Sequence, residues 1–301
     1  MKSKLRLPLG LRPLSLLLLL AIGSAGSALA QTHQAKKAAA KAPAQQAKVI
    51  LAINEGGAAN ADSSETLFRY QEFAEMLEKE MRAPIIMVAV RYPAKLKASL
   101  KKQEYAFLLS RPSDLPSEAI RDFGYRPVAT ATEAAQTLLI VHKNSTLRTI
   151  QDVKGRTILT PDQYSHIWRI TNAMLRDANI TMMNENVRAM RDQAAIGWSI
   201  ENEFFDVAAV NSVSGVGRTW EKKGHRVIAR SRPIPNMPLI ASPQITEAQL
   251  IAVRRAVVAL TDSDRGRAVL KKIAVPTGFT EVQPQVFLDF LKWIGDLEQN
   301  Y

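Results

Sequence analysis

The chain has 301 residues, of which 47% are hydrophobic and 23% are charged. This composition is typical of a globular protein with a large core, and the length suggests about two domains. The absence of cysteine excludes disulfides, thiolate metal sites, cysteine nucleophiles and iron–sulfur clusters together. Outside the N-terminal region, no apolar run approaches the roughly 18 residues of a membrane span, which excludes a protein with several spans.

The net charge of +12 is distributed unevenly along the chain. Residues 1–54 hold eight Lys and Arg and no acidic residue, which leaves 32 basic and 28 acidic side chains in the rest. The remainder is therefore only mildly basic. It also lacks a basic stripe with interleaved aromatic residues, so we do not expect nucleic-acid binding.

The N-terminus has the pattern of an export signal. Four basic residues among the first twelve precede the apolar segment Leu14–Ile22, and Ala28-Leu29-Ala30 offers small residues for cleavage. We predict a signal peptide over 1–30, cleaved after Ala30, and hence a periplasmic protein with no membrane span after cleavage. The alternative is an uncleaved single anchor. A bacterial lipoprotein is excluded because no cysteine follows the apolar segment.

Residues 31–47, rich in Ala, Gln and Lys, have no apolar face to bury and predict a flexible tether. Strands and helices then alternate, which predicts an α/β fold with parallel strands. The helix over 64–81, for example, repeats apolar residues every three or four positions. The predicted elements are strands at 48–53, 85–90 and 105–109, and helices at 64–81 and 93–102.

The second half begins with a long extended segment at 128–141 and a strand at 157–160. A helix is predicted from Pro161-Asp162 to about Ala178, with Asp162 as a candidate N-cap. We expect Gly215-Val216-Gly217 to form a turn, since it lacks the third glycine of a dinucleotide-binding loop. Further predictions are helices at 192–203, 246–260, 264–273 and from Pro284 onward, with strands at 207–210 and 227–229.

The sequence offers no support for catalysis. The four histidines have no metal-ligand spacing, and nucleophile-elbow and phosphate-loop motifs are absent. We therefore predict no enzyme, no metal and no cofactor. The histidines are His33, His142, His166 and His225.

Three stretches resemble the phosphate/phosphite/phosphonate-binding family of periplasmic solute-binding proteins. The first is Asn-Ser-Thr-Leu-Arg-Thr-Ile-Gln-Asp-Val-Lys-Gly-Arg at 144–156, similar to a run that ends in Asp-Leu-Lys-Gly-Lys/Arg in the family. The second covers 231–279 and holds Ile234-Pro235, paired helices and Gly278-Phe279. The third is Asp-Val-Ala-Ala-Val at 206–210, similar to an Asp-Ala-Ala strand. The resemblance spans about residues 48–298.

This resemblance implies a two-lobed α/β fold of the type 2 periplasmic binding protein, with a mixed sheet in each lobe. It implies two crossover hinge strands, at 128–141 and 227–241, and a ligand in the cleft between lobes that close over it. We place lobe 1 at 48–137 with 232–301, and lobe 2 at 138–231.

The expected ligand is a small phosphate- or phosphonate-like anion. In the family a Ser/Thr-rich turn after the strand at 157–160 contacts the oxyanion, whereas this chain has Pro-Asp-Gln-Tyr-Ser-His at 161–166. The helix start still offers N–H groups and a positive dipole end, although an Asp162 cap would compete with an anion. Strand ends supply further candidates. The predicted ligand-binding residues are Tyr164, Ser165, His166, Arg191, Asn54, Ser110 and Asn211.

Two functions follow from these observations. The first is a solute receptor that delivers the anion to the permease of an ABC importer. The second is a non-transport binding or accessory protein with an altered pocket, partnered by a sensor protein; the loss of the Ser/Thr-rich turn favours it.

Overall fold

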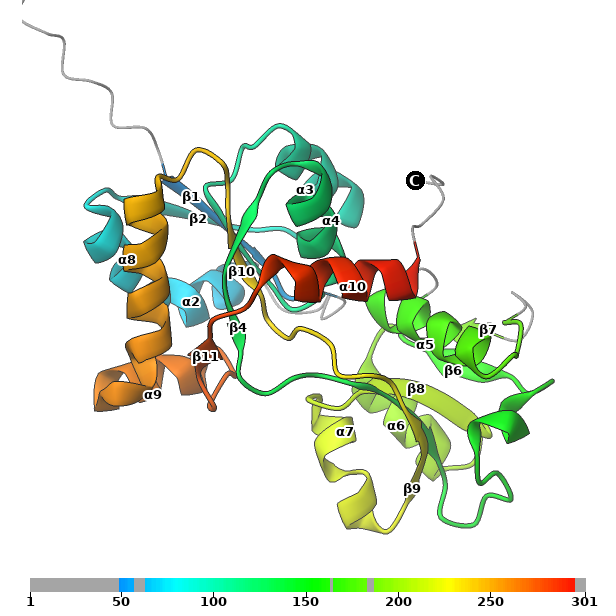
Figure 1. Cartoon of the computed structure of the whole chain (residues 1–301). Helices are drawn as coiled ribbons and strands as arrows, with labels where there is room; N and C mark the ends of the chain where they lie inside the picture. The colour runs from blue at the N-terminus through cyan, green and yellow to red at the C-terminus, as the bar shows by residue number, and fades with distance from the viewer. Residues whose placement is uncertain (1–48, 57–62, 163–164, 183–186, 296–301) are drawn as a thin grey trace, which may run out of the picture. The chain divides into compact units, whose positions relative to one another are not determined.

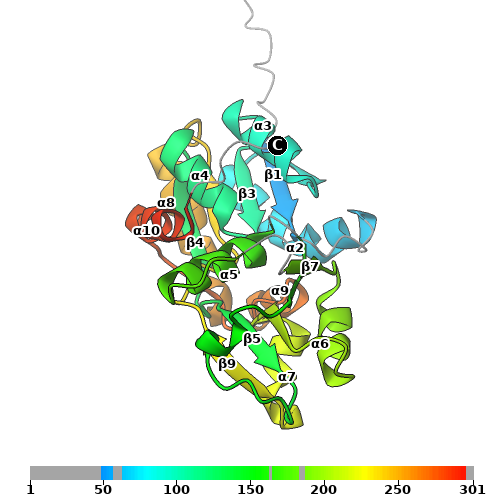
Figure 2. The ribbon, with the colours of Figure 1, turned by 90° about the vertical axis from the view of Figure 1, so that its right-hand side faces the viewer.

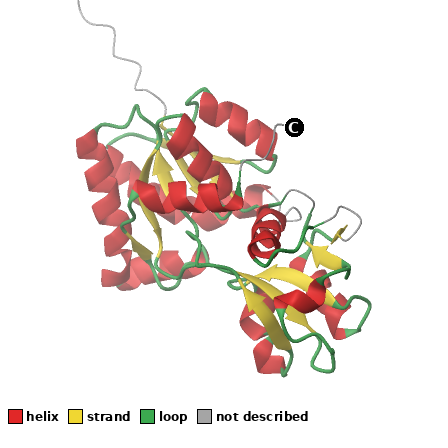
Figure 3. Cartoon of the chain, turned by 45° about the vertical axis from the view of Figure 1, so that its right-hand side comes forward, coloured by secondary structure: helices red, strands yellow, loops and turns green. Residues whose placement is uncertain are grey.

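A computed structural model describes residues 49–56, 63–162, 165–182 and 187–295. The predicted signal peptide and tether lie outside these residues. The described part of the chain forms two mixed β-sheets, each covered by helices, and these are the two lobes of the fold (Figures 1 and 3). None of its helices combines the length and apolar composition that a bilayer crossing requires.

Sheet 1 is the six-stranded sheet of lobe 1. Strands β1, β2, β3 and β4 run parallel to one another, because β10 pairs antiparallel with both β3 and β4. Their carboxyl ends therefore share one edge of the sheet. The spatial order is β11 (Phe279–Thr280), β4 (Arg126–Ala131), β10 (Leu239–Ala241), β3 (Phe107–Ser110), β1 (Val49–Asn54) and β2 (Ile85–Ala89).

Sheet 2 is the five-stranded sheet of lobe 2. Strands β6, β7 and β8 are parallel, and β5 pairs antiparallel with β8 and β9. Because Thr137 pairs with Asn211, β5 begins at the edge where β8 ends. The order is β7 (Val187–Ala189), β6 (Ile158–Thr160), β8 (Val207–Asn211), β5 (Thr137–Val141) and β9 (Arg226–Arg230).

Alternating side chains bury both faces of each sheet. In β1, Leu51 and Ile53 join the core beneath α2, α8 and α9, and Ala52 joins the core beneath α3 and α4. The helices of lobe 1 are α2 (Ser63–Met81), α3 (Pro93–Lys101), α4 (Asp114–Asp122), α8 (Glu247–Val258) and α9 (Asp264–Lys272), with a 3-10 turn at Ala259–Asp262.

In lobe 2, Leu139 faces the core shared with α5, and Leu138 and Ile140 face the core shared with α6. The helices are α5 (His166–Asp177), α6 (Gln193–Glu201) and α7 (Gly215–Thr219), with 3-10 turns at Ile150–Val153 and Glu221–Lys223. The last helix, α10 (Pro284–Ile294), contacts both α4 and α5 and runs beside them in both views (Figures 1 and 2).

The chain crosses between the sheets twice, from β4 to β5 and from β9 to β10. A bridge between Ala135 and Ile234 joins the two crossovers, and the Asn236 side-chain amide donates to the Glu133 carbonyl at 2.9 Å. The prediction of two crossovers is confirmed. The lobe boundaries proposed above, 48–137 with 232–301 and 138–231, remain a prediction.

Two local predictions are wrong. Helix α5 begins at His166 rather than at Pro161-Asp162, and its N-cap is Ser165 rather than Asp162. The Gly215-Val216-Gly217 segment forms the short helix α7 instead of a turn, because Ser214 caps it. Gly217 also lies so close to the end of β8 that a Cβ atom there would come within 2.2 Å of the Asn211 carbonyl oxygen.

Candidate functional site

The predicted ligand-binding residues gather at two sheet edges that adjoin the crossovers. Asn54 and Ser110 end β1 and β3, at the edge where β4 leaves sheet 1. Asn211 ends β8, and Ser165 and His166 follow β6, at the edge where β5 enters sheet 2. Tyr164 lies outside the described residues. In α/β sheets the carboxyl edges are where ligands bind, so this placement suits a binding site.

Asn54 and Ser110 are brought together on neighbouring strands of sheet 1. Both are buried, and the Asn54 side-chain amide donates to the Ser110 hydroxyl at 3.2 Å. The Ser110 hydroxyl donates to the Pro112 carbonyl at 2.7 Å, and the Asn54 side-chain oxygen accepts from the Gly56 N–H at 2.9 Å. These bonds shape the loops after β1 and β3, so both residues position the edge of the site.

A charged cluster lies directly beside this pair. The Glu55 carboxylate accepts hydrogen bonds from the Arg111 guanidinium and from the Tyr70 hydroxyl. Burial, reinforced by the Glu55 carboxylate, raises the pKa of Tyr70 far above its ordinary value. Arg111 also donates to the Ile273 carbonyl at 2.9 Å. The Arg111 charge is therefore already matched by a carboxylate of the protein.

Two hydroxyl groups of lobe 2 lie at or near the start of α5 and can donate hydrogen bonds. The Ser165 hydroxyl oxygen accepts from the Trp168 N–H at 3.2 Å, which leaves its own O–H free to donate. Thr160, which ends β6 five residues earlier, is fully buried, and its hydroxyl has no hydrogen-bond partner among the described residues. A buried polar group without a partner is costly, so a hydrogen bond from the Thr160 hydroxyl to a ligand or a water molecule would be favourable.

His166 faces a carboxylate of lobe 1. Its Nδ1 lies 3.4 Å from Asp114 Oδ1, and its ring lies 5.7 Å from that of Phe290 on α10. The Arg169 guanidinium donates to Asp114 Oδ2 at 3.2 Å. Burial opposes ionisation of Asp114, but the neighbouring His166 ring and the Arg169 guanidinium outweigh it and hold the Asp114 pKa well below its usual range. Asp114 is therefore a buried anion.

Arg191 and Asn211 are more loosely tied to the site. The Arg191 side chain is 78% exposed, and its Nε lies 3.7 Å from Asp162 Oδ2. The Asn211 side-chain oxygen accepts from the Val213 N–H at 3.0 Å, so it shapes the turn before α7. Of these two residues, Arg191 is the one whose charged side chain is exposed to solvent.

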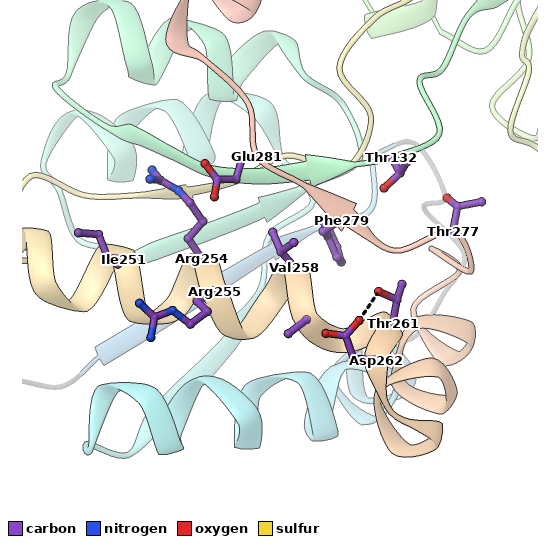
Figure 4. Close-up of a pocket in the computed structure, with 11 residues that line it drawn as sticks. Thr132, Ile251, Arg254, Arg255, Val258, Thr261, Asp262, Thr277, Phe279 and Glu281 are labelled. Carbon is purple, nitrogen blue, oxygen red and sulfur yellow. Dashed lines mark hydrogen bonds between the residues drawn. The ribbon is translucent and has the colours of Figure 1, made fainter.

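A separate pocket of about 510 Å³ lies on lobe 1, between α8 and the segment around β11 (Figure 4). Arg254 and Glu281 border it, and none of the predicted ligand-binding residues lines it. Arg254 donates to the carbonyls of Pro127 and Val128 at 3.0 and 3.1 Å, which gives it a structural role on β4. No group of three or more His, Asp or Glu side chains in the described chain is arranged to hold a metal ion.

Comparison with known proteins places these observations in a family. The family model described as "ABC transporter, phosphonate, periplasmic substrate-binding protein" matches residues 56–287. No curated protein sequence matches the chain significantly.

Solved structures share the fold. XAC2383 from Xanthomonas citri, solved bound to ATP, aligns with a TM-score of 0.65 at 12% identity, over 82% of this chain and 96% of its own. PhnD1 from Prochlorococcus marinus, in complex with methylphosphonate, gives 0.63 at 10% identity, over 81% and 96%. A binding protein of an ABC phosphonate transporter from Pseudomonas aeruginosa gives 0.60 at 16%, over 81% and 84%. These matches confirm the type 2 periplasmic binding protein fold.

Proposed function

This chain belongs to the family of periplasmic substrate-binding proteins of phosphonate ABC transporters, and from that premise we propose that it captures a small phosphate- or phosphonate-like anion for an importer. The family consists of binding proteins rather than enzymes. The proposed site lies between the carboxyl edge of sheet 1 and the start of α5.

The observation that carries the proposal is the start of α5. A helix N-terminus presents N–H groups and a positive dipole end, which favour an anion. Here the Ser165 hydroxyl has a free hydrogen to donate, and the buried Thr160 hydroxyl lacks a partner in the described chain. We assign Ser165 and Arg191 as donors to the anion, with Tyr164 and His166 as neighbours. Asn54, Ser110 and Asn211 shape the loops around it.

A second candidate is a sensory or accessory binding protein with an altered pocket. One observation favours it: two side chains at the proposed site already face carboxylates of the chain. His166 faces Asp114, and Arg191 faces Asp162 at 3.7 Å. An anion would have to compete with these carboxylates, which would weaken its binding.

We also propose that the protein is exported, with its signal peptide removed after Ala30. Membership of a periplasmic family supports export, and the order of basic, apolar and small residues in 1–30 supports the cleavage position. The intact mass of the protein from a periplasmic extract is expected to equal that of a chain that begins at Gln31. A mass that includes Met1–Ala30 would instead indicate an anchored protein.

Binding is tested by thermal unfolding with methylphosphonate, phosphate and sulfate. An anion present at a hundred times its Kd stabilises the folded state by about 2.7 kcal/mol. For a chain of this size the melting temperature is expected to rise by roughly 5–10 °C. Ser165→Ala and Arg191→Ala should each remove most of this rise, because each deletes a donor to the anion.

Ser214→Ala is the matched control. Ser214 caps α7 as Ser165 caps α5, and its hydroxyl oxygen accepts from the Gly217 N–H at 3.1 Å. Both substitutions lose a cap, about 1 kcal/mol each, but Ser214→Ala should keep the full ligand-induced shift. If no anion shifts the melting temperature of the unmodified protein, the proposed function is wrong. If the shift in melting temperature remains in Ser165→Ala, the anion binds at another place in the protein.

A further inference from the structure

Two arginines adjoin one carboxylate at the carboxyl edge of sheet 1. Glu55 directly follows β1, and its carboxylate accepts hydrogen bonds from the Tyr70 hydroxyl and from Arg111 Nε. Arg69 on α2 is the second arginine, and its Nη2 lies 3.7 Å from Glu55 Oε1. This distance is too long for a hydrogen bond, so Arg69 is near the carboxylate without being bonded to it. We call these four residues the edge cluster: Glu55, Arg69, Tyr70 and Arg111.

The edge cluster carries more positive than negative charge. Burial raises the pKa of Tyr70 far above its ordinary value, so its hydroxyl stays neutral. Both guanidiniums are always charged, and a single carboxylate faces them. Arg111 is further fixed by its bond to the Ile273 carbonyl, whereas Arg69 Nε is buried and has no hydrogen-bond partner among the described residues. Within the described chain, Arg69 is therefore the cation of the cluster that lacks a bonded carboxylate.

The neighbouring carboxylates of α2 do not compensate Arg69. Glu72 and Glu75, the next two carboxylates along the helix, form ion pairs with cations of α9. Glu65 is one turn before Arg69, but it is exposed, so water screens its charge. The Arg69 side chain is itself 31% exposed, which leaves part of it accessible to a ligand.

The edge cluster adjoins the start of α5, where the anion is proposed to bind. Arg111 is three residues before Asp114, so their Cα atoms are at most about 11 Å apart. Asp114 in turn faces His166, the first residue of α5, with 3.4 Å between Oδ1 and Nδ1. The loops after β1 and β3 also lie against each other, since a Cβ atom on Gly56 would come within 2.9 Å of the Pro112 ring. The short segment 111–114 thus links the cluster to the proposed anion site.

We propose that Arg69 is the residue of lobe 1 that binds the anionic ligand. The inference rests on the proposed function and adds a cation from lobe 1 to the donors assigned to lobe 2. A guanidinium can donate two parallel hydrogen bonds to two oxygens of a phosphate or phosphonate group, which a lysine ammonium group cannot match. Because the Glu55 carboxylate keeps its bonds to the other two members of the cluster, Arg69 can turn to the ligand without leaving a carboxylate unpaired.

Isothermal titration calorimetry with methylphosphonate and with phosphate tests this role. In Arg69→Met the Kd of the bound anion is expected to rise about tenfold or more, the range of a lost hydrogen bond to a charged group. Arg69→Lys keeps the charge without the paired donors, so its Kd should lie between those of the parent and Arg69→Met. The Kd of the parent should also rise more steeply with NaCl concentration than that of Arg69→Met, because the parent has one more cation at the site.

Arg265→Met is the matched control. Arg265 on α9 also lies 3.7 Å from a carboxylate of α2, but it is outside the edge cluster. The substitution removes the same charge from lobe 1 and should leave the Kd and its salt dependence unchanged. If Arg69→Met does not fold, Arg69→Gln removes the charge while keeping a polar side chain, and should raise the Kd in the same way.

The outcomes separate the role of Arg69 from the proposed function. If neither anion binds to the parent protein, both are wrong. If Ser165→Ala weakens binding and Arg69→Met does not, the proposed function stands and Arg69 has no part in it. An equal effect of Arg69→Met and Arg265→Met would also overturn the inference, because binding would then respond to net charge alone.

Discussion

Trp220→Ala is expected to lower the free energy of unfolding by about 3–5 kcal/mol, and the melting temperature by about 10 °C. Trp220 is 1% exposed in the core between sheet 2 and α6. Its indole N–H donates to the carbonyls of Val141 and Arg226, at 3.2 and 3.0 Å, across the pair formed by β5 and β9. Truncation leaves a cavity and deprives these two carbonyls of their hydrogen-bond donor. Urea unfolding followed by circular dichroism would measure the loss of stability.

Trp198→Ala is the matched control for this substitution. Trp198 also lies on lobe 2, but it is 56% exposed and its main ring contact is with the exposed Phe204, at 5.3 Å. Its loss should cost less than about 1 kcal/mol. Equal effects of the two substitutions would contradict the packing described for Trp220.

A second readout follows from the ring stack on Trp220. The His225 ring lies 4.4 Å from Trp220 and 5.0 Å from His142. Burial and the nearby His142 hold the pKa of His225 below its usual value. Trp220→Ala opens this stack to water, so the pKa of His225 should rise toward that of a free histidine, as followed by NMR titration.

Elements with strong local signals could be predicted from the sequence. The helix predicted from residue 246 begins with a capping box of Thr246 and Gln249, in which the Gln249 N–H donates to the Thr246 hydroxyl oxygen at 3.3 Å. Pro284 opens α10 as expected, since its missing N–H has no helical partner at that position. The long apolar repeat of α2 likewise predicted the bounds of that helix to within one residue. In each case the residues that decide the structure are neighbours in sequence.

Helix α4 was missed because its signal is not local. Its nine residues, Asp-Leu-Pro-Ser-Glu-Ala-Ile-Arg-Asp, contain a proline and few apolar positions. The polar residues Asp114, Ser117 and Glu118 are nevertheless buried. What compensates the two carboxylates is Arg169, more than fifty positions further along the chain. The sequence pattern therefore predicted no element here, whereas the fold buries these polar residues between helices.

The same distance in sequence limited the prediction of the site. Ser165 and His166 were chosen because they stand at a helix start, and α5 does begin there. Nothing near them indicated that Asp114 would face His166, or that Arg191 would lie beside Asp162. Which charges remain available to an anion is decided by tertiary pairing, so candidate donors could be chosen from the sequence but their partners could not. Their role in binding remains a prediction.

Asp114→Asn should make the free energy of unfolding depend less on pH in the acidic range. The folded state holds the Asp114 pKa well below its usual range, so the ionised carboxylate stabilises the fold at neutral pH. Because the unfolded pKa is about 3.9, this contribution is complete above that value and is lost as pH falls toward the lower folded pKa. At pH 7 the variant should be less stable by about 2–3 kcal/mol, the usual value of hydrogen bonds to a charged group.

Urea unfolding at pH 7, 5, 4 and 3 measures this dependence. The stability difference between the parent protein and Asp114→Asn should be largest at pH 7 and 5 and shrink by pH 3, as Asp114 begins to be protonated on unfolding. Asp152→Asn serves as the control, because hydrogen bonds from the Arg148 and Thr149 N–H groups also lower the Asp152 pKa, but its carboxylate is exposed. It should change the acid dependence less, since water screens the charge. A stability difference for Asp114→Asn that stays constant from pH 7 to 3 would mean that Asp114 acts through its shape and hydrogen bonds, and not through its charge between α4 and α5.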